Sequence, residues 1–176
     1  MMMFSNTMIS SMLLIEYLKV KKNITFEPMN NWQVKENFLK HWSESYVYPL
    51  WRAGIMPVEE QTGIIGLDKV LTGKDFNFMV KKAFGFTGDK LDEEMITRQA
   101  AIVYFADKLT AAKIKINPQA VQMFKDVKDA AIKAKIDLLS SNGVIKGNDR
   151  NELELAKEIT KAEMATMVAR MQKLIK

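Results

Sequence analysis

The sequence predicts an all-α protein, a pseudo-repeated helical bundle with short loops. Three observations predict this class. Apolar residues recur at helical spacing along the chain, the three clearest of these stretches each begin just after a threonine, and alternating apolar and polar runs are few. Apolar residues make up 48% of the 176 residues, enough for a folded domain with its own core. We expect at most very short strands, in the loops 56–71 and 145–158.

The clearest helix start lies in the sequence KEITKAEMATMVARMQKLI near the C-terminus. Thr160 can accept a hydrogen bond from the backbone N–H of Glu163, and the Glu163 side chain can reach back to the N–H of Thr160. This reciprocal pair is a capping box. The following apolar residues share one helix face. They are Met164, Met167, Val168, Met171 and Ile175.

Two weaker versions of this phrase lie upstream, in KVLTGKDFNFMVKKAF and EMITRQAAIVYFADKL. Thr72 is followed by Asp75 at the acidic position of the box, whereas Thr97 is followed by Ala100, so that the second box is half formed. A leucine or isoleucine precedes each threonine, where it can pack on the helix as a hydrophobic staple. These residues are Leu71, Ile96 and Ile159.

Two glycines predict where shorter helices end. Residues 44–56 and 129–145 are helical patterns that finish in Gly54–Ile55 and Gly143–Val144. A glycine in the left-handed conformation followed by an apolar residue is a common helix stop. The predicted unit is thus a short helix, a glycine stop, a loop and a threonine-capped helix. It spans about 38–84 and 124–174, with a partial copy at 89–109 that lacks the first helix. Residues 36–176 form the predicted repeat domain, and 1–35 a helical segment or truncated repeat.

Composition limits the chemistry. There is no cysteine and only one histidine, His41, so disulfides, thiolate metal sites and multi-histidine sites are excluded. We expect no cofactor and no metal. The net charge of +5 favours an anionic partner. No stretch approaches the ~18 apolar residues of a membrane span. The N-terminus has no basic region before its apolar run, which Glu16 interrupts, so we do not interpret it as a signal peptide.

The last unit resembles the repeat of the S-layer homology family. The resemblance is carried by FKDV at 124–127, NGVIKG at 142–147 and ITKAEM at 159–164, which occur in the family's order. The first unit supplies KHWSESYVYPLWRAGIM and DKVLTGKDF, and the middle one supplies MITRQAA. The similarity of the three units together covers about two-thirds of the chain.

The resemblance implies three repeats in a pseudo-threefold helical prism, and a role in attachment. Such modules hold proteins to the surface of Gram-positive bacteria by binding an anionic secondary cell-wall polymer, and the localisation implied is extracellular. The family's motif arginine is replaced by Gly73 in the first unit and is present as Arg98 in the middle one. Lys161 stands there in the last unit and keeps the charge but not the forked geometry of a guanidinium. The polymer-binding residues implied are Arg98, Lys161, Trp42 and Gly147.

Each of these residues also has a purely structural interpretation. Arg98 can be a solvent-exposed residue at a helix start, Trp42 a core residue and Gly147 a turn residue. Trp32 and Trp51 are expected to pack in the interior, and Asp126 to cap the helix that follows it. His41 has neither a serine or cysteine elbow nor an orienting acid at a telling spacing, which disfavours a catalytic base.

Three functions remain open from the sequence. The first is the non-catalytic wall-binding module. The second is a helical module for protein–protein contact or self-association that has lost glycan binding. The third is a cytoplasmic basic protein that binds nucleic acid or membrane, which we disfavour along with an enzyme, because no phosphate loop, metal cluster or nucleophile elbow is present in the sequence.

Overall fold

The structure is a computed structural model that describes residues 40–59 and 64–175. Within these ranges the regular structure is helical, with no strand and only isolated bridges, which confirms the all-α class. The segment 1–35 and Trp32 lie outside the described residues. The helices are α2 (Glu44–Arg52), α3 (Gly73–Phe84), α4 (Arg98–Ala111), the 3-10 helix η1 (Pro118–Ala120), α5 (Ala130–Ser141) and α6 (Lys161–Met171).

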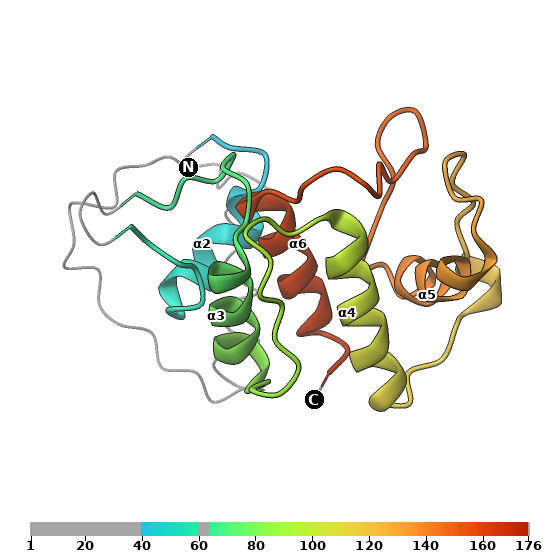
Figure 1. Cartoon of the computed structure of the whole chain (residues 1–176), viewed down its shortest axis with the longest axis horizontal. Helices are drawn as coiled ribbons and strands as arrows, with labels where there is room; N and C mark the ends of the chain where they lie inside the picture. The colour runs from blue at the N-terminus through green and yellow to red at the C-terminus, as the bar shows by residue number, and fades with distance from the viewer. Residues whose placement is uncertain (1–39, 60–63, 176) are drawn as a thin grey trace, which may run out of the picture.

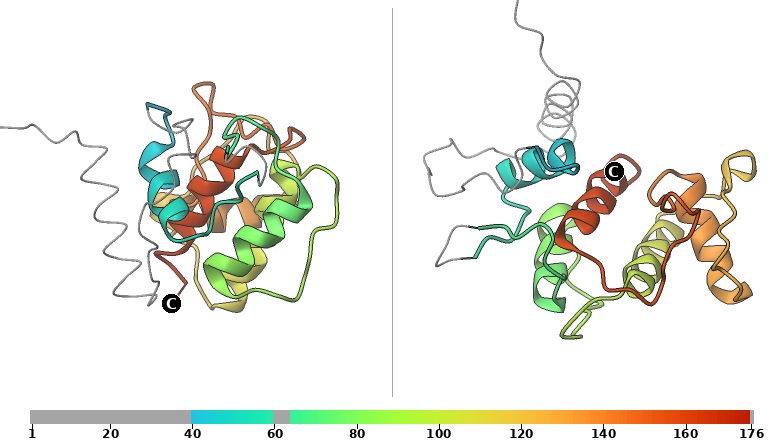
Figure 2. Two further views of the ribbon diagram at one scale, coloured as in Figure 1. Left: turned by 90° about the vertical axis from the view of Figure 1, so that its left-hand side faces the viewer. Right: turned by 90° about the horizontal axis from the view of Figure 1, so that it is seen from above.

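Helix α6 lies at the centre of the molecule, between α3 and α4 (Figure 1). The view from above shows the same order (Figure 2). Helix α2 packs on α6, and α5 packs on α4. The apolar faces predicted for the three threonine-capped helices form much of the core, because Phe76, Phe105 and Met164 are each completely buried.

All three predicted N-caps are confirmed. Each threonine hydroxyl accepts a hydrogen bond from the backbone N–H three residues later, and each threonine has an extended backbone. The last start has the full capping box that was predicted, because Glu163 also accepts a hydrogen bond from the N–H of Thr160 at 3.1 Å. At the first start Asp75 stands at the acidic position but makes an ion pair with Lys161 instead. The three capping bonds are Asp75 to Thr72 at 3.1 Å, Ala100 to Thr97 at 3.2 Å and Glu163 to Thr160 at 3.3 Å.

The apolar residues just before the three threonines form a closed ring of backbone hydrogen bonds. The N–H of Leu71 donates to the carbonyl of Ile159 at 2.8 Å, the N–H of Ile159 donates to Ile96 at 2.8 Å, and the N–H of Ile96 donates back to Leu71 at 2.9 Å. All three residues are at most 1% exposed. Buried backbone groups must find partners, and here the ring provides them without a sheet.

A second set of bonds joins the same three helix starts, and its donors run the opposite way around the ring, from α3 to α4, from α4 to α6 and from α6 to α3. The first N–H of a helix has no acceptor within its own helix. Here it donates to the carbonyl of a residue just ahead of a neighbouring helix. These hydrogen bonds place the first turn of each helix beside the first turn of a neighbouring helix. The three pairs are Gly73 to Glu93, Arg98 to Lys157 and Lys161 to Lys69, at 3.0, 2.8 and 3.1 Å.

The junction at the start of α3 is filled by backbone. Within the described residues no helix occurs between α3 and α4. A side chain at Gly73 would have no room, because a Cβ there would lie 2.4 Å from the carbonyl oxygen of Leu91. Asn77 fixes this segment by bonding both the N–H and the carbonyl of Leu91, at 3.1 and 2.8 Å.

Both predicted glycine stops are confirmed. Gly54 and Gly143 have φ of 68° and 71°, and in each case the glycine N–H and the next N–H bond back to the last helical turn. This is the Schellman arrangement. Helix α4 ends the same way, but Lys113 takes the glycine position with φ of 59°. The two bonds at this end join Lys113 to Thr110 and Ile114 to Leu109, at 2.9 and 3.0 Å.

We predict that Lys113→Gly raises the free energy of unfolding by about 0.5–1 kcal/mol, because a lysine pays a steric cost in the left-handed region that a glycine avoids. Chemical denaturation measures the change. Lys115→Gly is the matched control, since Lys115 is also an exposed lysine after α4 but does not have positive φ. Equal effects of the two substitutions would contradict the assignment of Lys113 as the helix stop.

Candidate functional site

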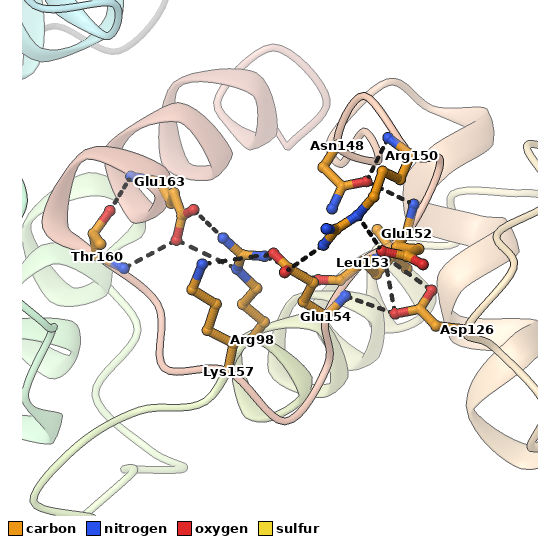
Figure 3. A network of polar contacts seen from close by, with 10 residues as sticks. All are labelled: Arg98, Asp126, Asn148, Arg150, Glu152, Leu153, Glu154, Lys157, Thr160 and Glu163. Atoms are coloured by element: carbon orange, nitrogen blue, oxygen red, sulfur yellow. Dashed lines mark hydrogen bonds and ion pairs between the residues drawn. The ribbon is translucent and has the colours of Figure 1, made fainter.

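The side chain of Arg98 lies at the first turn of α4 and spans to the first turn of α6. Its Nε and Nη2 groups donate to the two carboxylate oxygens of Glu163, the capping-box residue, with Nε at 3.4 Å. Its Nη1 group donates to the carboxylate of Glu154 at 2.9 Å and to the carbonyl of Leu153 at 3.1 Å. Figure 3 shows the guanidinium held between the two carboxylates. Arg98 is therefore neither free in solvent nor open to a ligand on its forked face, and only 18% of its side chain is exposed.

The loop that carries Glu154 is tied down by Asp126. The Asp126 carboxylate accepts hydrogen bonds from the N–H groups of Leu153, at 2.9 Å, and of Glu154, at 2.7 Å (Figure 3). The expectation that Asp126 caps the next helix is wrong. Asp129 caps α5 instead, since it accepts from the N–H of Ala131 at 2.8 Å. The backbone amides of Leu153 and Glu154, which lie far from Asp126 in the sequence, thus bind its carboxylate, and the amides at the start of α5 do not.

Glu154 is surrounded by cations. The hydrogen bond from Arg98, with the charges of Lys157, Arg98 and Arg150, holds the pKa of Glu154 below its ordinary value, against a smaller opposite effect of burial. Its backbone has φ of 52°, which a glutamate rarely adopts. The charge network and the Asp126 bonds together hold this conformation.

A cavity of about 290 Å³ lies beside the Arg98 network, between the first turns of α4, the length of α6 and the loop 144–153. We call it the Trp42 cavity. Its apolar floor is formed by Ile102, Val144, Ile145, Ile159 and Met167. Its polar and aromatic edge includes Trp42, Arg98, Lys146, Gly147 and Arg170, and also two carboxylates, Glu152 and Glu163, which are paired with Arg150 and Arg98. The structure therefore brings together three of the four residues that the resemblance implied, namely Trp42, Arg98 and Gly147.

Trp42 is 61% exposed and is not a core residue. It stands just before α2, whose packing on α6 brings it to the cavity. The neighbouring His41 ring fixes this turn, because its Nδ1 lies 2.7 Å from the Ser43 hydroxyl and its Nε2 lies 3.1 Å from Asp68. A large aromatic face open to solvent at the edge of a cavity suits a flat ligand such as a sugar ring.

The contacts of His41 resemble a serine–histidine–aspartate triad in composition only. The Ser43 hydroxyl would have to be the nucleophile, and Ser43 is completely buried. A nucleophile must reach the substrate. These three residues therefore serve to fix the start of α2.

Arg170 enters the cavity from the last turn of α6. One of its Nη1 hydrogens goes to the carbonyl of Val144 at 3.1 Å, and its guanidinium lies over the ring of Tyr46, 5.4 Å from the centroid. Among the described residues it has no carboxylate partner. Lys146 is exposed and likewise has no ion pair within the described part of the chain. These two cations were missed from the sequence, since nothing in the spacing of Lys146 and Arg170 marks them as neighbours of one cavity.

Lys161 lies outside the Trp42 cavity. Its ammonium group makes an ion pair with Asp75 at 3.0 Å, and only 8% of its side chain is exposed. Gly147 lines the cavity, but the reason for a glycine there is local. A Cβ at this position would lie 3.0 Å from the ring of Phe124. The glycine thus lets the loop pack closely on Phe124.

The described ranges hold no group of three or more His, Asp or Glu side chains arranged to hold a metal ion. In the same ranges, no helix combines the length and the apolar character needed to cross a membrane.

Comparison of the chain with protein-family models, with curated proteins and with solved structures gave no match in any of the three.

We predict that Glu154→Gln destabilises the protein at neutral pH and that this difference disappears in acid. The pKa of Glu154 is lowered in the folded state, so its charged form contributes stability above the ordinary value of 4.5, and this contribution is lost as the pH falls through the lower folded value. Thermal melts of both proteins from pH 7 to pH 3 measure the difference.

Glu158→Gln is the control for this series, because Glu158 is a nearby glutamate whose side chain has no ion pair among the described residues. A difference in melting temperature between wild type and Glu154→Gln that stays constant across the whole pH range would contradict the role of the Glu154 charge.

Proposed function

We propose that this chain is a non-catalytic cell-surface anchoring module that binds an anionic secondary cell-wall polymer in the Trp42 cavity, on the outside of a bacterial cell. The observation that carries the proposal is the exposed Trp42 at the edge of a cavity that has an apolar floor and two cations, Lys146 and Arg170, without a carboxylate partner among the described residues. An aromatic face stacks on a sugar ring, and a cation binds an acidic substituent.

The helix starts support the resemblance on which this proposal draws. Three threonine-capped starts are joined by the ring of backbone bonds, and a second set of three bonds joins the same starts with its donors running the opposite way around. An arrangement of three equivalent helix starts is what a pseudo-threefold array of repeats requires. The two short helices with matching glycine stops, α2 and α5, each pack on the threonine-capped helix of another unit, which are α6 and α4.

The net charge of +5 supports an anionic partner but does not by itself select a glycan. Diffuse attraction of a basic protein to any polyanion weakens steeply with added salt. A shaped site depends instead on particular side chains. The experiment must therefore separate these two sources of binding.

We predict that the protein sediments with purified Gram-positive wall sacculi that carry their anionic polymer, and not with sacculi from which acid has removed it. At about 0.15 M salt, Trp42→Ala should weaken this binding at least about tenfold, because an aromatic anchor of a binding site often contributes 2 kcal/mol or more. The bound fraction is measured as a function of protein concentration.

Met123→Ala is the matched control. Met123 is 78% exposed and does not line the Trp42 cavity, so its loss should leave binding unchanged. Absence of binding by the wild-type protein would overturn the anchoring function and favour a helical module for protein–protein contact or self-association. Equal binding by wild type and Trp42→Ala, with release at moderate salt, would show that the protein is held by diffuse electrostatic attraction and not by a shaped site.

A further inference from the structure

We infer that Arg170, assisted by Lys146, is the group that recognises a carboxylate on the ligand of the Trp42 cavity, and that Arg98 is a positioning residue that holds the cavity wall. This inference rests on the proposed function and assigns the chemistry within the same site. It departs from the residue that the resemblance alone would select, which is Arg98.

The hydrogen-bond donors of Arg98 are nearly all in use. A guanidinium has five N–H groups. Four of them go to Glu163, Glu154 and the carbonyl of Leu153. A carboxylate is gripped by two parallel N–H groups, and one remaining N–H cannot provide this grip. A ligand carboxylate at Arg98 would have to displace Glu154 or Glu163.

Displacing either glutamate disturbs the wall of the cavity. Glu163 completes the capping box of α6, and Glu154 lies in the loop whose backbone is held by Asp126. The charge of Arg98 is also already neutralised by these two carboxylates, which would repel a third one nearby. The contacts of Arg98 therefore join α4, α6 and the loop 153–154, and so position three sides of the site.

Arg170 has the donors that Arg98 lacks. The contacts of Arg170 engage one N–H, which donates to Val144, and leave a forked edge of the guanidinium without an acceptor among the described residues. The ring of Tyr46 lies against the guanidinium and limits its movement. A planar cation held in this way is suited to bidentate binding of a carboxylate.

Arg170 also lies close to the aromatic residues at this edge of the cavity, since its guanidinium lies over Tyr46 and both Arg170 and Trp42 line the cavity. Trp42 and Tyr46 are four residues apart at the start of α2, and α2 packs on the helix that carries Arg170. Lys146 lines the same cavity from the loop after α5 and adds a second positive charge. A sugar that stacks on Trp42 thus meets cations on the α6 and loop sides. The ligand class that this arrangement favours is a sugar residue that bears a carboxylate.

The test compares Arg170→Lys and Arg98→Lys in the sacculus sedimentation assay and in thermal melts. Lysine keeps the charge and removes the fork. We expect Arg170→Lys to weaken binding about tenfold or more, with a melting temperature close to that of the wild type. We expect Arg98→Lys to lower the melting temperature by several degrees and to weaken binding by about threefold at most. Lys128→Arg, a charge-retaining change at an exposed lysine outside the cavity lining, is the control that should change neither quantity.

A second measurement uses a small probe and does not need the wall. Titration with D-glucuronate, with D-glucose as the uncharged control, should shift the Trp42 indole N–H signal in the wild type, and Arg170→Lys should abolish the shift. This measurement decides the question even if Arg98→Lys does not fold.

The possible failures are distinct. If the wild-type protein does not bind polymer-bearing sacculi, the proposed function is wrong, and this inference is wrong with it. Wild-type protein that binds, together with Arg170→Lys that binds equally well, overturns the inference alone. A folded Arg98→Lys that loses binding while Arg170→Lys retains it would show that Arg98 exchanges its glutamates for the ligand, and would also overturn the inference.

Discussion

Three backbone hydrogen bonds among Leu71, Ile96 and Ile159 hold the helix starts of this protein together. Their peptide groups are buried, and each one supplies a donor to one neighbour and an acceptor to the other. Unpaired polar groups in the interior are costly, so no member of the ring can leave without orphaning the other two. The ring therefore fixes which helix starts meet, including those of α4 and α6, which Arg98 and Glu163 also join.

The three junctions around the ring use the same positions in different ways. At α4 the first helical residue is Arg98, and it reaches Glu163 at the third position of α6. At α6 it is Lys161, and it reaches Asp75 at the third position of α3. At α3 it is Gly73, and backbone occupies the space that a side chain would need. Equivalent positions thus produce a charged network beside a cavity, a buried ion pair and a junction closed by backbone.

Local features were predictable from the sequence because their causes lie within a few residues. A threonine three residues before the amide that it caps, and a glycine followed by an apolar residue, act through short stretches of chain. The ring could not be predicted, since its partners lie far apart in sequence and have no distinctive residue types. Asp126 was misjudged for the same reason. Its side chain accepts hydrogen bonds from the amides of Leu153 and Glu154 and not from those of the nearby helix.

The candidate site was predictable only in part. Motif resemblance selected Trp42, Arg98 and Gly147, which do lie around one cavity. It could not reveal that Arg98 is saturated by carboxylates or that Lys161 is buried, because both depend on which acidic residues the fold brings nearby. Arg170 has no motif of its own, and only the packing of α2 on α6 brings it to Trp42.

The ring also has a consequence for how the chain is made. Leu71 and Ile96 leave the ribosome well before Ile159, so only one of the three bonds can form before Ile159 emerges. The packing of α2 on α6 must wait as well, although α2 is the earliest of the described helices. Until the last helix emerges, the apolar residues at the centre have no complete set of partners. Folding of these helices is thus expected to be completed only after α6 has been synthesised, as a cooperative event that joins α2 to α6.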